Sequence, residues 1–192
     1  MIEDMVGKLL LATPSMNDRF FKDSVVLLCH HDDEGSMGLV LNKVQGVNVF
    51  DVLDDMGLCK EPLARGKAQM TFEEQAVHEA GPVDAYRGFV LHGADKVYDS
   101  TMCLSDEIYL TTSKDILELL AQGKGPERFL LLLGYAGWEA GQLEQELIDN
   151  DWLLGDASQT LIFETAIEDQ WALAARKIGF ERSQLMNQIG HA

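Results

Sequence analysis

FLLLLGYAGW, residues 129–138, is the stretch that decides the fold of this chain. Its continuous apolar half, residues 129–133, predicts a central strand buried on both faces of a sheet. The closely spaced glycines Gly134 and Gly137 predict a tight strand-to-helix turn at residues 134–138. A helix is expected at about residues 140–150, with its apolar side chains toward the core. The stretch therefore predicts a strand, a corner and a helix in succession.

Shorter apolar runs on both sides of this stretch predict further strands. These are residues 7–13, 25–30, 37–42, 75–80, 88–92, 101–104, 108–111 and 160–163. Short loops join several of these strands, which favours antiparallel neighbours. Strands and helices do not alternate throughout, so a doubly wound parallel sheet is not indicated. We predict one mixed α/β domain over residues 1–192.

Other segments predict the remaining helices and loops. Asn48 is expected to cap a short helix whose apolar face carries Val49, Val52, Leu53 and Met56. Ser113 should cap another helix, and a capping box at residues 165–168 should open the last helix, which ends at Gly179. Residues 59–74 are polar and predict a long loop.

Composition and charge limit the functions that are expected. The 192 residues are 46% hydrophobic, enough for a proper core. No apolar run reaches the length of about 18 residues that a membrane span needs. The acidic start Met1-Ile2-Glu3-Asp4 lacks the basic region of a signal peptide, so a cytoplasmic location and no membrane association are expected.

The net charge of −17 argues against direct nucleic-acid binding, because an acidic surface repels phosphate backbones. Residues 129–175 contain no Lys or Arg and carry acidic residues throughout: Glu139, Glu144, Glu146, Asp149, Asp151, Asp156, Glu164, Glu168 and Asp169. This surface has two interpretations. It is either a solvated face or a docking surface for a basic partner.

The cysteines and histidines indicate neither a disulfide framework nor a metal site. Cys29, Cys59 and Cys103 are far apart, and no Cys-x-x-Cys pair occurs. Cys29 and Cys103 are expected to be buried in strands, and Cys59 to be exposed after a helix. The run 30–34, HHDDE, has metal-ligating residue types, but consecutive strand residues point to opposite faces. No metal or cofactor is expected.

A small anion is the ligand that the predicted turn suggests. Helix N-termini present free N–H groups and a positive dipole end. The spacing matches neither a dinucleotide fingerprint nor a P-loop, and Glu139 opposes an anion. A tight turn with Trp138 packed on the core is the alternative. The candidate ligand-binding residues are Gly134, Tyr135, Gly137 and Trp138 in the turn, with Thr13, Pro14, Asn17, Asp18 and Asn42 beside strand ends. Turn capping is the other interpretation of these five.

Together these segments resemble the AlgH/YqgE family over nearly the whole chain. The matching stretches are residues 13–18, 24–29, 37–42, 87–92, 110–115, 134–138, 141–144, 150–153 and 190–192. The resemblance implies an α+β fold with a small closed β-barrel and a branching, largely antiparallel sheet flanked by helices. It also implies a cytosolic bacterial protein described as a transcriptional regulator. Arg19, Val44 and Ala80 depart from the family pattern, which has proline at the first two positions and glycine at the third.

Three functions remain as hypotheses. The first is a regulatory protein that acts through a protein partner or a small ligand. The second is an enzyme or anion binder that uses the 134–138 turn with the loop at residues 13–18; no catalytic residue is assigned, since no Gly-x-Ser-x-Gly elbow occurs. The third, direct DNA binding, is disfavoured by the charge. If the second holds, a pocket should lie where that loop meets the turn.

Overall fold

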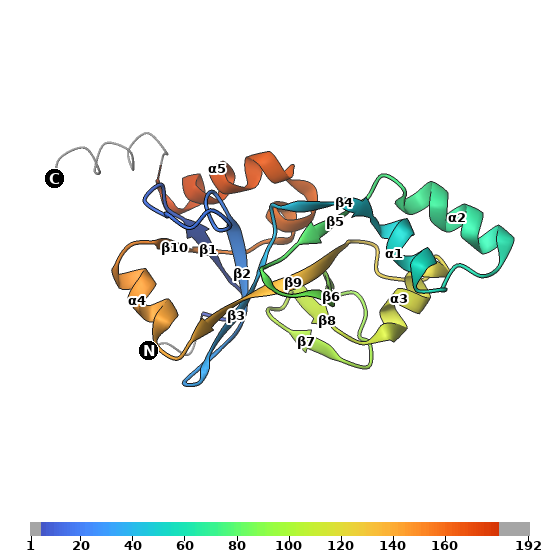
Figure 1. Cartoon of the computed structure of the whole chain (residues 1–192), viewed down its shortest axis with the longest axis horizontal. Helices are drawn as coiled ribbons and strands as arrows, with labels where there is room; N and C mark the ends of the chain where they lie inside the picture. The colour runs from blue at the N-terminus through green and yellow to red at the C-terminus, as the bar shows by residue number, and fades with distance from the viewer. Residues whose placement is uncertain (1–4, 181–192) are drawn as a thin grey trace.

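The computed structural model describes residues 5–180. Within that range one branched sheet runs through the molecule, and helices gather at its two ends and along one side (Figure 1). The strands are β1 (Lys8–Ala12), β2 (Val25–Asp32), β3 (Gly35–Val40), β4 (Val44–Asn48), β5 (Ala76–Glu79), β6 (Val83–Gly93), β7 (Thr101–Cys103), β8 (Ile108–Thr111), β9 (Phe129–Glu139) and β10 (Trp152–Asp156).

Strand β9 is the branch point of the sheet. The main path runs β10-β1-β2-β3-β9-β6-β8-β7, and β5 adds to β9 beside it and carries β4. The first half of β9 pairs with β6 and β5, and its second half pairs with β3. The pairing of β5 with β9 is parallel, and the other pairings within residues 5–180 are antiparallel.

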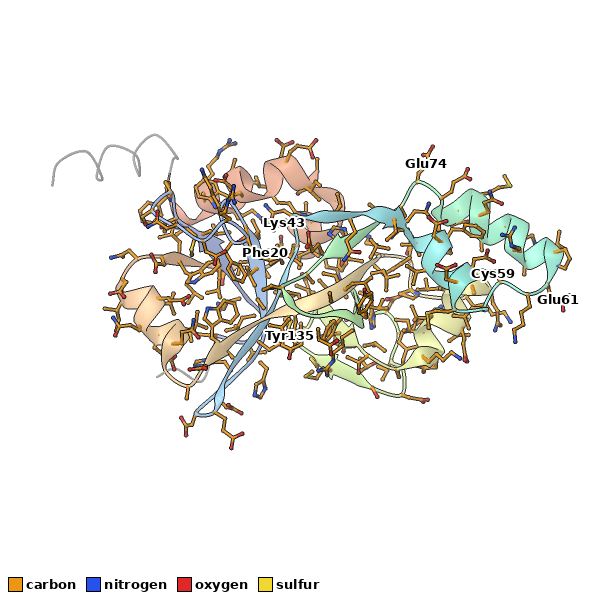
Figure 2. The ribbon with its side chains drawn as sticks, viewed as in Figure 1. Phe20, Lys43, Cys59, Glu61, Glu74 and Tyr135 are labelled. Atoms are coloured by element: carbon orange, nitrogen blue, oxygen red, sulfur yellow. The ribbon has the colours of Figure 1, made fainter. Side chains whose placement is uncertain are left out.

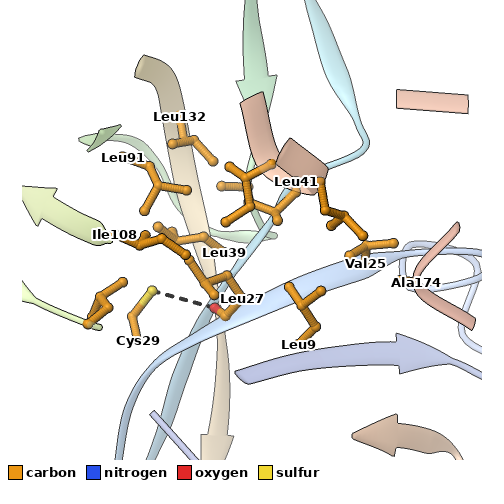
Figure 3. Packing of buried hydrophobic residues seen from close by; sticks show 14 of the residues in the cluster. Leu9, Val25, Leu27, Cys29, Leu39, Leu41, Leu91, Ile108, Leu132 and Ala174 are labelled. Carbon is orange, nitrogen blue, oxygen red and sulfur yellow. Dashed lines mark hydrogen bonds between the residues drawn. The ribbon is translucent and has the colours of Figure 1, made fainter. Parts of the chain in front are cut away.

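The apolar run at the start of β9 separates two cores, as its two-sided pattern predicts. Leu132 belongs to a core with Leu9, Leu27, Leu39 and Leu91, which Figure 3 shows converging from several strands. Leu131 faces the opposite way, into a core built with α1, α2 and α3. A third core lies beneath the second half of β9. Both faces of the strand are therefore covered.

The prediction of a strand-to-helix turn at residues 134–138 is wrong. Strand β9 continues through this stretch to Glu139, and residues 136–139 pair with β3 from Gly35 to Gly38. Gly134 has a φ of +76° and sits against the backbone of Gly81. A Cβ on Gly81 would lie 1.9 Å from the carbonyl carbon of Tyr135. Gly81 and Gly134 thus allow two backbone segments to cross closely within the sheet, and they do not form the predicted turn into a helix.

The helices are α1 (Val49–Asp55), α2 (Pro62–Phe72), α3 (Lys114–Ala121), α4 (Gln142–Ile148) and α5 (Ile167–Ile178), with a π-helix at Thr160–Glu164. Helix α4 confirms the helix expected at about residues 140–150, and α1 confirms the cap, since the Asp51 N–H donates to Asn48 Oδ1 at 2.8 Å. Helices α1, α2 and α3 gather at one end of the molecule, and α4 lies at the other (Figure 1).

Three local expectations are wrong. Residues 59–74 contain α2, which begins with Pro62 in its first turn. Residues 160–163 form the π-helix instead of a strand, and the strand in this part of the chain is β10. The capping box fails because Ala166 occupies the N-cap of α5 and the Thr165 hydroxyl donates to the carbonyl of Thr160. Ser113 does occupy the N-cap of α3 as expected, but its hydroxyl donates to Asp115 and makes no capping hydrogen bond.

The predicted fold class is confirmed: a mixed α/β protein with a curled, branching and largely antiparallel sheet flanked by helices. The barrel is a half-barrel, since the path of strands ends at β10 on one side and β7 on the other. Among residues 5–180, no helix has the length and apolar character needed to cross a membrane.

Candidate functional site

The first loop, which comes directly after β1, meets the end of β9 at a pocket of about 300 Å³. Helix α4 and the start of β10 complete its walls. We call it the acidic pocket, and its lining is Met16, Asn17, Asp18, Phe21, Gly137, Trp138, Gln142, Glu146, Asp151 and Trp152. The loop and the glycine-rich stretch therefore do come together, as the second hypothesis requires, although the stretch is a strand.

Three aromatic rings form one wall of the acidic pocket. Phe21 stacks on Trp138 with ring centroids 6.3 Å apart, and it meets Trp152 edge-on at 5.7 Å. The two indoles are themselves 5.9 Å apart and nearly perpendicular. Gly38 makes room for this cluster, because a Cβ there would lie 3.2 Å from Trp138 Cζ3. The rings fix one another, so this wall is preorganised.

Glu146 ties the aromatic wall to α4. Its Oε2 accepts the indole N–H of Trp138 at 2.8 Å and that of Trp152 at 2.7 Å. Its Oε1 accepts from Gln142 Nε2 at 2.8 Å, and Gln142 Oε1 accepts the backbone N–H of Glu139 at 3.0 Å. One carboxylate thus joins β9, β10 and α4, with its negative charge held at the pocket.

The remaining carboxylates make the pocket strongly acidic. Burial raises the pKa of Asp151, and the negative charges of Glu146 and Asp149 raise it further. Among the described residues, no side chain forms a hydrogen bond or ion pair with the Asp151 carboxylate. Asp18 Oδ1 accepts the N–H groups of Phe20 and Phe21 at 2.8 and 3.0 Å, which shapes the loop. No Lys, Arg or His belongs to the lining, so the pocket suits a cation.

Four of the predicted ligand-binding residues line this pocket: Asn17, Asp18, Gly137 and Trp138. Thr13 and Pro14 precede it in the loop. The Thr13 hydroxyl donates to the carbonyl of Asn150 at 2.8 Å and also bonds Ser15 Oγ, so it holds the loop to the start of β10.

Three predicted residues lie elsewhere. Asn42 fastens the far end of the loop, accepting from the Val25 N–H and donating to the Asp23 carbonyl. Gly134 packs on Gly81 at the backbone crossing. Tyr135 packs edge-on against Phe89 with ring centroids 6.3 Å apart, away from the labelled Phe20 of the first loop (Figure 2).

Sequence reasoning missed the other six pocket residues: Met16, Phe21, Gln142, Glu146, Asp151 and Trp152. Gln142 and Glu146 are four apart on α4, so helical spacing does place them on one face. That spacing alone does not show that this face meets the indole of Trp138. The missing information is the pairing of β1 with β10, which brings Trp152 opposite Ala12.

The cysteine and histidine expectations have mixed outcomes. Cys29 is buried as expected, but Cys59 is buried and Cys103 is exposed, both contrary to expectation. His30 Nε2 lies 2.8 Å from Asp32 Oδ2, whereas His31 Nδ1 lies 2.7 Å from Ser36 Oγ. The neighbouring imidazoles thus have separate partners. Within residues 5–180, no three His, Cys, Asp or Glu side chains are grouped to hold a metal.

Comparison with known proteins decides the family. A family model described as AlgH-like matches residues 9–183. This chain belongs to the AlgH-like family. A UPF0301 protein of Xylella fastidiosa is 44% identical over 188 residues, covering 98% of this chain and 96% of the relative. Another from Shewanella woodyi is 45% identical over 191 residues and covers 100% of both chains.

Two solved structures support the same fold. The solution structure of the AlgH protein from Pseudomonas aeruginosa matches with a TM-score of 0.77 and 38% identity, covering 100% of this chain and 98% of that one. A crystal structure of a Corynebacterium diphtheriae protein matches with a TM-score of 0.66 and 22% identity, covering 91% and 87%. The second likeness concerns the fold alone.

Proposed function

We propose that this AlgH-like protein is a regulatory protein that acts by binding a basic partner at the acidic pocket. One observation carries the proposal: the loop at residues 16–21 and the end of β9 form a preorganised pocket whose carboxylates have no basic residue among them. Such a pocket attracts an ammonium or guanidinium group, both by the charge of its carboxylates and by the ring faces of its aromatic wall. The family resemblance implies the regulatory role.

Direct contact with DNA is a poorer explanation of a regulatory role. The chain carries 32 Asp and Glu against 15 Lys and Arg, and the binding of phosphate backbones draws on clustered basic side chains. A protein with this charge affects gene expression more readily by occupying a basic surface of another protein.

A small anion also fits the pocket poorly. The backbone N–H groups expected to hold it belong to β9, where residues 136–139 are paired with β3. Asp18, Glu146 and Asp151 would repel it. The raised pKa of Asp151 favours a second candidate at the same place: binding or turnover of a small organic cation, with Asp151 as an acid or base.

The test measures binding of wild-type protein, Asp151→Asn and a control, Asp169→Asn, which changes an exposed carboxylate at the start of α5. Proteins captured from a lysate of the native organism should be retained by the control and lost with Asp151→Asn. Capture should weaken as salt rises. A partner retained by Asp151→Asn would contradict the pocket, and a gel shift of DNA by wild-type protein at low salt would contradict the indirect mechanism.

A thermal-shift screen separates the two candidates. Spermidine and an arginine amide should raise the melting temperature of wild-type protein, because a ligand bound only to the folded state stabilises it by mass action. Phosphate and ATP should not. A shift with small cations and no captured protein supports the small-molecule candidate; a larger shift with ATP than with spermidine would refute a cation site.

A further inference from the structure

A second cavity, of about 470 Å³, lies at the other end of the molecule, between α1, α3 and the outer face of β6 and β9. We call it the apolar cavity. Its lining is Val52, Met56, Tyr86, Gly88, Val90, Thr111, Thr112, Ser113, Lys114, Leu117, Leu131 and Leu133. It meets β9 at residues 131 and 133, before the bend at Gly134, so it shares no residue with the acidic pocket.

The floor and rim of this cavity are hydrophobic. Val90 and Leu131 form buried floor positions on the sheet, and Leu117 of α3 and Val52 of α1 flank them. At the rim, Tyr86 is 93% exposed and Met56 is 42% exposed. Large apolar side chains left in water beside a hydrophobic hollow mark a binding site more often than isolated ones do.

The polar groups of the lining gather at one end, where β8 runs into α3. Two of their hydroxyl groups already have protein partners: Thr111 bonds His92 and Thr101, and Ser113 bonds Asp115. Among residues 5–180, the ammonium group of Lys114 makes one long, exposed ion pair, with Glu118 at 3.6 Å. Thr112 and Lys114 are therefore the groups that can turn to a ligand, and no carboxylate belongs to the lining.

The Asp115 carboxylate, which bonds the lining residue Ser113, already has two donors from the protein. It accepts from the Ser113 hydroxyl at 2.5 Å and from the N–H of Asp99, in the loop between β6 and β7, at 3.0 Å. Lys114 is thus the one charged side chain of the lining, although the chain as a whole is acidic. This is the reverse of the acidic pocket, where carboxylates line the site and cations are absent.

We propose that the apolar cavity binds a fatty acid: its acyl chain on Val90, Leu131 and Leu133, and its carboxylate on Lys114 and Thr112. The volume falls in the range of small-molecule sites, roughly 300–1,000 Å³. The cavity is walled by α1, α3 and the sheet, so it accommodates one acyl chain better than it accommodates the flat surface of a protein partner. This site is separate from the proposed regulatory pocket, and either can stand without the other.

Gly88 offers a variant that fills the cavity. A Cβ on Gly88 meets only Leu133 Cδ2 at 3.8 Å, which is an ordinary contact, so a larger side chain enters open space. Gly88→Val also suits a strand, because β-branched residues favour that conformation. Lys114→Gln removes the charge for the head group. Lys124→Gln is its matched control, since Lys124 is exposed just beyond the other end of α3.

The experiment titrates full-length protein with decanoate and, in parallel, with 1-decanol, by calorimetry. Wild-type protein and Lys124→Gln should bind decanoate with the same saturable affinity. Gly88→Val should show no binding while keeping its melting temperature. Lys114→Gln should bind decanoate about fivefold more weakly, the size expected for one exposed charge contact, and should bind decanol unchanged.

Methyl chemical shifts of wild-type protein locate the ligand without relying on any variant. They should move at Val90, Leu117 and Leu131 and stay still near Trp138. The proposal is overturned if wild-type protein does not bind decanoate saturably, if the moving methyls lie elsewhere, or if a folded Gly88→Val binds as well as wild type. Dimerisation that Gly88→Val abolishes would assign the cavity to a second copy of the chain and overturn it too.

Discussion

Glu146→Ala tests the hydrogen-bonding core of the acidic pocket. In the folded chain one oxygen of Glu146 accepts two indole N–H groups, at 2.8 and 2.7 Å. The two tryptophan residues, Trp138 and Trp152, are only 6% and 2% exposed, so water replaces the lost acceptor poorly. The substitution therefore leaves two buried donors without a partner and removes the anchor of α4.

The magnitude comes from these two bonds. A hydrogen bond to a charged group contributes about 1.5–3 kcal/mol, and leaving a buried donor unpaired costs a similar amount. We expect Glu146→Ala to lower the free energy of unfolding by about 3–5 kcal/mol. For a chain of this size that corresponds to a drop in melting temperature of roughly 6–20 °C.

Thermal and urea unfolding, followed by tryptophan fluorescence and circular dichroism, measure the effect. Glu118→Ala is the control: it removes a helical glutamate whose ion pair with Lys114 is exposed, and it should cost about 0.5 kcal/mol or less. Glu146→Gln keeps an acceptor oxygen but loses the charge, so it should fall between the two. A Glu146→Ala protein as stable as Glu118→Ala would refute the reasoning.

Three further outcomes are expected. Gly81→Ala should destabilise by more than about 4 kcal/mol because its Cβ would lie 1.9 Å from the backbone of Tyr135, whereas Gly46→Ala meets no atom within 4 Å and should stay folded in the same urea titration. Burial lowers the pKa of His78 and His92 from 6.5, so on acidification the unfolded chain binds protons at a higher pH than the folded chain does. The free energy of unfolding should therefore be fully present above about pH 6.5 and fall as the pH drops below it. A melting temperature that stays constant between about pH 7 and 5 would contradict this. A thiol reagent should label Cys103 in the native protein and all three cysteines in denaturant; native labelling of Cys29 would show that its core opens.

The functional site is only partly predictable from the sequence. The loop at residues 13–18 and the stretch at 134–138 are recognisable as candidate site segments because polar loop residues and glycines are common at binding sites. Their meeting at the acidic pocket depends on the pairing of β3 with β9 and of β1 with β10. Those pairings join residues about 100 positions apart for β3 and β9 and about 140 or more apart for β1 and β10, so no local sequence pattern predicts them. The acidity of the pocket is missed for the same reason, since Glu146 and Asp151 reach it from α4 and the start of β10.

By itself, the sequence determined the class of the fold and its central strand. The run at residues 129–133 must be covered on both faces, because five consecutive apolar side chains alternate between the two sides of any strand. Tertiary structure decided the path of the chain after that run. The strand continues beyond Gly134 because residues 136–139 pair with β3 and because Gly134 packs against the backbone of Gly81. Likewise α2 buries little more than Ala68 and Phe72, a face too narrow to recognise until its neighbours are in place.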